Sequence, residues 1–207
     1  MLNLEDLYRQ IEICRGCELS RTRTKVVPGE GPVDASILFI GEAPGFHEDQ
    51  QGRPFVGPAG QFLEQLLSSI NLKRSQVYIA NVIKCRPPSN RDPFPGEIQA
   101  CAKWLDQQIA ALNPKVIVTL GRFSMARYFP NETISKIHGK PKILPDYACF
   151  PMYHPAAALH QGNLRKVIET DILKLPSVLL EMQRKTSPVK PVELVEPKFE
   201  DKQLNLF

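Results

Sequence analysis

The sequence predicts an α/β fold in which a parallel β-sheet carries helices on both faces. Several short runs of Val, Ile, Leu and Phe are continuous rather than alternating, as in strands that are buried on both faces. The clearest of these runs is Ile37-Leu38-Phe39-Ile40. Segments with apolar residues at helical spacing separate the runs. Strands that alternate with helices in this way pair in parallel, because each helix carries the chain back across the sheet.

The elements can be placed in chain order from these patterns. Asn3 suits the N-cap of the first helix, whose Leu4, Leu7 and Ile11 share one face. The following elements are expected: a helix at 4–13, a strand at 36–41, a helix at 59–70, a strand at 77–82, a helix at about 95–111, a strand at 116–121, a short helix at 122–128, a strand at 148–152 and a helix at 163–182.

Length and composition indicate one domain followed by a tail. The chain has 207 residues, of which 43% are hydrophobic, enough for one sizeable core. From about Thr186 the chain becomes rich in Pro, Lys and Glu and loses its periodic apolar pattern. We therefore expect a domain over residues 1–182 and a disordered tail over residues 183–207.

The net charge and the first residues of the chain indicate the compartment and the kinds of partner to expect. The formal net charge of +4 permits nucleic-acid binding without demanding it. The first residues lack the apolar run of a signal peptide, and no stretch approaches the roughly 18 apolar residues that span a membrane. We therefore expect a monomeric cytoplasmic protein without a membrane partner. Five cysteines in such a compartment indicate metal binding or catalysis rather than disulfides.

Four of the cysteines form a candidate metal centre. Cys14 and Cys17 are spaced so that both thiolates can reach one centre, and Cys85 and Cys101 supply a wider second pair. Four thiolates suit either a tetrahedral zinc ion or an iron–sulfur cluster, and spacing alone does not separate the two. Cys149 lies inside an apolar strand and is interpreted as a core residue.

Polar side chains follow three of the expected strands. Glu42, Asn81 and His154 stand where these strands end, so in a parallel sheet they converge on one edge. Asn can read the edge of a planar base, and Phe55 can stack on its face. His154 can donate a hydrogen bond to charge on a leaving group, and a carboxylate such as Glu42 can orient a water. Neither a Walker sequence nor a dinucleotide-binding fingerprint is present.

These motifs resemble those of the family 4 uracil-DNA glycosylases. The resemblance rests on Gly41-Glu42-Ala43-Pro44-Gly45, Glu48-Asp49, the stretch from Gly52 to Gly57, Asn81 and His154-Pro155-Ala156, and it covers about residues 5–180. It implies a three-layer α/β/α fold with a four-stranded parallel sheet. It also implies a [4Fe–4S] cluster on Cys14, Cys17, Cys85 and Cys101, so the domain would begin with a cluster-binding segment.

The resemblance further implies monofunctional excision of uracil from DNA, in which the flipped deoxyuridine is hydrolysed and an abasic site remains. Phe55 would stack on the flipped base, Asn81 would bind its edge, and His154 would stabilise the uracil anion. The water-positioning role is open between Glu42 and Glu48. Gly41, Ala43 and Gly45 are assigned to substrate binding, and Arg86 and Arg91 to DNA phosphates. The alternative function is a non-catalytic uracil- or damage-binding module, or an iron–sulfur redox module.

The C-terminal pentapeptide is a candidate partner-binding motif. Gln203-Leu204-Asn205-Leu206-Phe207 places three large apolar residues at the end of a polar stretch. It resembles the Gln-Leu-x-Leu-Phe motif with which bacterial proteins bind the replicative sliding clamp. In that case Leu204, Leu206 and Phe207 would contact the clamp and Gln203 would bind at the rim of its pocket.

Overall fold

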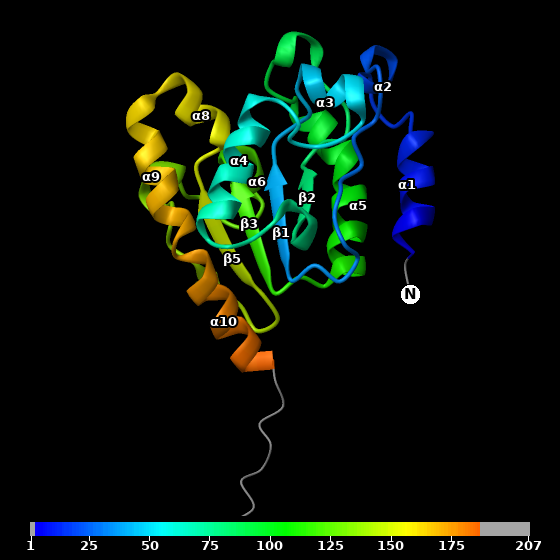
Figure 1. Ribbon diagram of the computed structural model, residues 1–207. Helices are drawn as coiled ribbons and strands as arrows, with labels where there is room; N and C mark the ends of the chain where they lie inside the picture. The colour runs from blue at the N-terminus through cyan, green and yellow to red at the C-terminus, as the bar shows by residue number, and fades with distance from the viewer. Residues whose placement is uncertain (1–2, 187–207) are drawn as a thin grey trace, which may run out of the picture.

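The computed structural model describes residues 3–186, and within this range the sheet has five strands in the order β2-β1-β3-β5-β4 (Figure 1). They are β1 (Ile37–Gly41), β2 (Tyr78–Asn81), β3 (Val116–Leu120), β4 (Lys142–Ile143) and β5 (Ala148–Met152). The four predicted strands pair in parallel. Their C-terminal ends therefore meet at one edge of the sheet, which is the upper edge in Figure 1.

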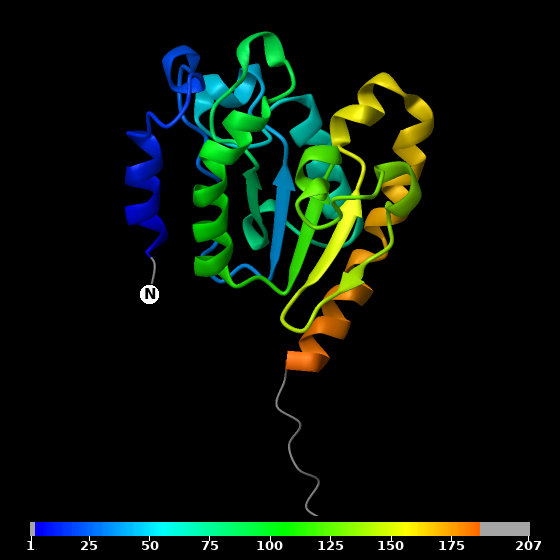
Figure 2. The ribbon, with the colours of Figure 1, turned by 180° about the vertical axis from the view of Figure 1, so that it is seen from behind.

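Helices cover both faces of this sheet, which confirms the predicted α/β class. The helices are α1 (Leu4–Glu12), α2 (Leu19–Thr22), α3 (Phe46–Gln51), α4 (Pro58–Ser69), α5 (Pro95–Leu112), α6 (Arg122–Ala126), α7 (Ile134–Ile137), α8 (Pro155–His160), α9 (Gly162–Ile172) and α10 (Leu175–Thr186). Two 3-10 turns, η1 (Arg74–Gln76) and η2 (Pro88–Asn90), flank β2. The helices α4, α9 and α10 pack on one face, and α1 and α5 on the other (Figures 1 and 2).

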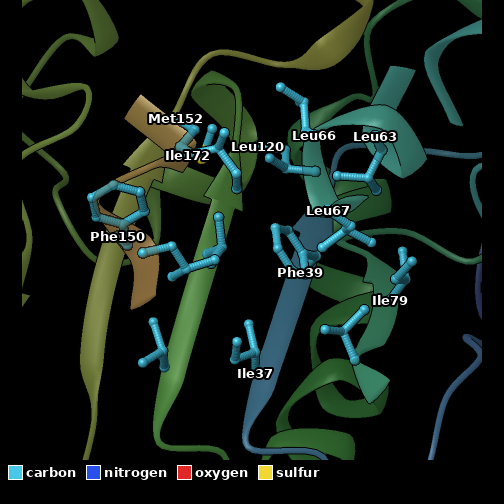
Figure 3. Packing of buried hydrophobic residues seen from close by; sticks show 14 of the residues in the cluster. Ile37, Phe39, Leu63, Leu66, Leu67, Ile79, Leu120, Phe150, Met152 and Ile172 are labelled. Carbon is cyan, nitrogen blue, oxygen red and sulfur yellow. The ribbon is translucent and has the colours of Figure 1, made fainter. Parts of the chain in front are cut away.

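The alternation of side chains along β1 divides the core in two. Ile37 and Phe39 join the cluster under α4, α9 and α10, which Figure 3 shows from close by. Leu38 and Ile40 join the cluster under α1 and α5. Because successive side chains of a strand point to opposite faces, a run without a polar residue is what a three-layer fold requires.

Three details differ from the predicted elements. The helix expected at 163–182 is two helices, because Pro176 lacks the N–H that a continuous helix would need and stands in the first turn of α10. The short strand β4 pairs antiparallel with β5 and was not predicted. Helix α10 continues to Thr186, beyond the predicted domain end at 182.

The predicted tail lies almost wholly outside the described residues. This holds for the clamp-binding-like motif, with Gln203, Leu204, Leu206 and Phe207, so that hypothesis stays a prediction. Over the range that the structure describes, no helix combines the length and the apolar character needed to cross a membrane.

Candidate functional site

The polar side chains at the strand ends border one cavity of about 390 Å³. Pairing of Gly41 with Asn81 in the sheet brings the ends of β1 and β2 together. His154 caps α8 directly after β5. The cavity is lined by Glu42, Ala43, Pro44, Gly45, Glu48, Phe55, Ala59, Asn81, Pro87, Asn90, Arg91, His154, Ala156 and His160. Residues from four separate segments of the chain, 42–48, 55–59, 81–91 and 154–160, thus converge as the parallel sheet predicts.

Phe55 forms one wall of the cavity in an unusual backbone conformation. Its φ is +50°, in the left-handed region that costs a residue with a side chain about 1–2 kcal/mol. The ring is buried and stacks on the His154 ring, with centroids 5.5 Å apart and planes 27° apart. Gly60 in α4 makes this position possible, because a Cβ there would lie 1.9 Å from the Phe55 carbonyl oxygen.

Gly41 lies behind the cavity, between two of its walls. A Cβ at position 41 would lie 2.3 Å from Asn81 Oδ1 and 2.7 Å from Cε2 of Phe55. Real side chains essentially never approach so closely. The glycine therefore acts by leaving space for Asn81 and Phe55 rather than by lining the cavity itself.

Asn81 carries a buried acceptor that no protein group satisfies. Its side chain is 2% exposed, and within residues 3–186 its Oδ1 has no hydrogen-bond partner. Buried polar atoms are nearly always paired, so an unpaired one beside a cavity indicates a polar ligand. A planar base with a ring N–H would supply the missing donor.

His154 is held as a neutral hydrogen-bond donor. Its Nδ1 accepts a hydrogen bond from the Ala156 N–H at 3.1 Å, so the ring proton sits on Nε2. Burial lowers the pKa of His154 to about 4, although the negative charge of Glu48 opposes this shift. The imidazole is therefore uncharged at neutral pH, with one N–H left to donate.

Glu42 is the carboxylate that remains free at the cavity. Burial raises its pKa to about 6; the charge of Asp92 adds to this shift and that of Arg122 opposes it. In the described part of the chain, no hydrogen bond occupies its carboxylate oxygens. Glu42 is thus available to take a proton or to hold a water near neutral pH.

Glu48 has a different role, because both of its carboxylate oxygens accept hydrogen bonds from backbone N–H groups. Oε1 accepts from the N–H groups of Val56 and Gly57, each at 2.9 Å. Oε2 accepts from the N–H of Gly45 at 3.1 Å. This carboxylate ties the start of α3 to the loop that carries Phe55, so it positions two walls of the cavity.

The two candidate phosphate-binding arginines have unequal surroundings. Arg91 lines the cavity but forms a bidentate ion pair with Glu97, with its Nη2 2.7 Å from Oε1 and its Nη1 2.9 Å from Oε2. Arg86 is not among the lining residues; its Nε donates to Asn90 Oδ1 at 2.7 Å and its guanidinium lies over the exposed ring of Phe46. Arg86 thus keeps more of its donors free than Arg91.

The four cysteines border a second, narrow cavity on the face of the sheet that α1 and α5 cover. Cys14 and Cys17 come from the connection between α1 and α2, Cys85 follows β2, and Cys101 lies in α5. Arg23 Nη1 donates to Cys85 Sγ at 3.0 Å. Among residues 3–186, no three His, Cys, Asp or Glu side chains lie close enough together to hold a single metal ion. Cys149 is fully buried within β5, as interpreted from the sequence.

Several residues at the site were missed by sequence reasoning. Ala59, Pro87, Asn90 and His160 line the cavity. Asn90 belongs to the stretch 85–93, which is rich in Pro and Arg. Its left-handed φ of +55° is a conformation that Asn tolerates. Nothing in the sequence alone identifies His160, which follows three alanines and Leu159.

The chain is similar in sequence to proteins of one family. A model of the uracil DNA glycosylase superfamily matches residues 28–173. The type-4 uracil-DNA glycosylase of Sulfurisphaera tokodaii is 46% identical, over 90% of this chain and 89% of that protein. The type-4 enzymes of Archaeoglobus fulgidus and Thermotoga maritima are 45% and 41% identical, over 84% and 85% of this chain and 92% and 94% of theirs.

Proposed function

Because this chain belongs to the type-4 uracil-DNA glycosylases, we propose that it releases uracil from DNA by hydrolysing the bond between base and deoxyribose. The observation that carries this proposal is the unpaired Oδ1 of Asn81 beside the ring of Phe55. These groups offer an edge acceptor and a stacking face, which is what a single flipped base requires.

Recognition precedes the chemical step. Uracil flipped from the duplex would stack on Phe55 and place its ring N–H against Asn81 Oδ1. Gly45 and Ala43 line the same cavity without long side chains, so they leave room for the base. The cost of unstacking the nucleotide is offset by these contacts, and the Asn81 acceptor gains its missing partner.

Bond cleavage moves an electron pair from the glycosidic bond onto the uracil ring. His154 Nε2–H would donate to a uracil carbonyl oxygen, whose negative charge grows as the bond breaks. A neutral imidazole suits this role, because it stabilises the uracil anion through a hydrogen bond and need not transfer a proton to this weak base. Water then adds to the sugar carbon, and Glu42 would accept the proton that this water loses. Among residues 3–186, those that line the cavity include no lysine that could form a Schiff base, so the DNA backbone would stay intact.

Of the two carboxylates, Glu42 and Glu48, we assign the water-positioning role to Glu42. All the hydrogen bonds of Glu48 go to backbone N–H groups of the loops that surround the base. The pKa of Glu42 near 6 lies closer to neutral pH than that of an ordinary carboxyl, as suits a general base.

We further propose that Cys14, Cys17, Cys85 and Cys101 hold a [4Fe–4S] cluster. All four thiols border one cavity, which places them where they can ligate one centre together. Burial raises the pKa of the Cys85 thiol, and the positive charge of Arg23 beside it opposes this shift. When bound, the cluster supplies a cross-link between chain segments rather than a step of the hydrolysis.

The remaining assignments follow from the function. DNA is the partner at the cavity edge, with Arg86 as a phosphate contact. None of the five cysteines forms a disulfide in the described structure, which fits a reducing compartment and supports a cytoplasmic location. A monomeric state and a sliding-clamp partner are proposed from the sequence alone.

The test is incubation with a uracil-containing oligonucleotide, followed by alkaline cleavage. We expect a break at the uracil position only after alkali, and none in the same oligonucleotide with thymine. A uracil-binding module would shift the oligonucleotide in a gel without producing alkali-labile sites. A redox module would do neither, and either outcome would contradict the proposal.

A further inference from the structure

The loop that carries Phe55 is held from two sides. On the N–H side, Glu48 accepts hydrogen bonds from Val56 and Gly57. On the carbonyl side, Arg74 Nη1 donates to the Phe55 oxygen at 3.0 Å, and Arg74 Nη2 donates to the Pro54 oxygen. The guanidinium of Arg74 therefore holds the carbonyl groups of Pro54 and Phe55, and the carboxylate of Glu48 holds the N–H groups that follow the left-handed bend at Phe55.

Arg74 is itself anchored by acidic residues. Its Nη2 lies 3.2 Å from Glu30 Oε2, and its Nη1 lies 3.6 Å from Glu64 Oε1. Its side chain is only 16% exposed, so solvent screens these interactions weakly. The planar fork of a guanidinium can bind two adjacent carbonyl oxygens and a carboxylate together, which a lysine cannot do.

We propose that Arg74 is a positioning residue for Phe55. The guanidinium keeps the backbone of Pro54 and Phe55 in the conformation that presents the ring to a flipped base. Arg74 stands at the start of η1 and does not itself line the cavity, so it acts only through the loop. This inference rests on the proposed function, because it assumes that Phe55 stacks on the base.

Arg53 provides a matched control. It pairs with the same Glu30, at 2.7 Å from Nη2 to Oε1, but is 55% exposed and makes no hydrogen bond to the Phe55 loop in the described structure. Arg53→Met thus removes a cation from Glu30 but keeps the hydrogen bonds from Arg74 to the carbonyl oxygens of Pro54 and Phe55. If Arg74 mattered only as a partner of Glu30, the two variants would behave alike.

The experiment is a double-mutant cycle of Arg74→Met and Phe55→Ala. We expect Arg74→Met to lower kcat/KM on a uracil oligonucleotide by about tenfold or more when Phe55 is present, and by less than about twofold in the Phe55→Ala background. Free uracil should also inhibit Arg74→Met more weakly than the parent. Arg53→Met should stay within about twofold of the parent.

Melting temperatures separate positioning from folding. If Arg74→Met does not fold, Arg74→Lys takes its place in the cycle, because it keeps a cation beside Glu30 but cannot bind both carbonyls. Equal fold losses in the two Phe55 backgrounds would overturn the role of Arg74 alone. A parent protein that releases no uracil would instead overturn the proposed function on which the role depends.

Discussion

A single hydrogen bond sets the chemistry available to His154. Because Nδ1 accepts from the Ala156 N–H, the ring cannot rotate to offer a lone pair to the base without losing that bond. The cavity is thus equipped with a neutral donor, whereas an imidazolium would require the charge to be buried. Leaving-group stabilisation by such a donor is strongest when the charge on the base is largest, which is in the transition state.

Replacement of His154 should therefore lower kcat more than it raises KM. We expect His154→Ala to reduce kcat by about 100-fold to 1000-fold, the range found when one donor to a developing anion is removed. Single-turnover kinetics at saturating enzyme measure the effect. His47→Ala, at an exposed histidine outside the cavity lining, is the control. An unchanged kcat in His154→Ala would remove this residue from the mechanism.

Glu42 should determine the acid limb of the pH profile. Its carboxyl has a pKa of about 6, so it loses its charge as the pH falls through 6, and a protonated acid cannot accept the proton of water. We expect kcat to fall below pH 6 in the parent. In Glu42→Gln the rate should be low and free of that limb, since His154 stays neutral down to about pH 4. An acid limb that is the same in both proteins would contradict the role of Glu42.

At the scale of elements, the cysteine cavity joins parts of the chain that are far apart in sequence. It brings the α1–α2 connection against the segment after β2 and against α5. Helix α1 packs mainly on α5, so a bound centre would fasten this outer layer to the sheet. Metal binding by such a site contributes directly to folding.

Substitution of one cysteine ligand should lower both the iron content and the thermal stability of the protein. We expect the purified protein to be brown and to contain iron and sulfide, and Cys101→Ala to lose most of its iron and to melt at a lower temperature. Cys149→Ala is the control, because it alters a buried cysteine of β5 outside that cavity. Metal analysis and thermal unfolding give the two readouts. Zinc without iron in the parent would overturn the cluster.

The elements also show how far the sequence can be interpreted. The four parallel strands were predictable because each is a continuous apolar run, and the meeting of Glu42, Asn81 and His154 follows from their parallel order. Strand β4 was missed because two residues carry no periodicity. The role of Glu48 was missed because its partners are backbone N–H groups, which one loop presents only after folding.

At the scale of the whole molecule, the described chain ends far from the substrate cavity. Helix α10 finishes at the lower edge of the molecule in Figure 1, opposite the edge where the strands end. A partner held by the residues that follow would not need to cover the cavity. The geometry is therefore compatible with tethering to a sliding clamp through a linker.

Deletion of residues 203–207 should abolish clamp binding and leave uracil release from short oligonucleotides unchanged. Leu206→Ala with Phe207→Ala should act like the deletion, because both side chains would lose apolar contact. Asn205→Ala is the matched control, since that position is variable in the motif. Surface plasmon resonance on an immobilised bacterial clamp, and in parallel an archaeal one, measures the effect. Equal binding by truncated and full-length proteins would refute the hypothesis.

The empty space at Gly41 also limits how this protein can diverge. Any side chain at that position would meet Asn81 on β2 and Phe55 in the loop before α4 at once. A lineage that lost the glycine would have to shift two segments together, and no single later substitution could restore both. New base specificities must therefore arise by mutation elsewhere around the cavity, such as at Ala43 or Ala156, where a single small side chain forms the wall.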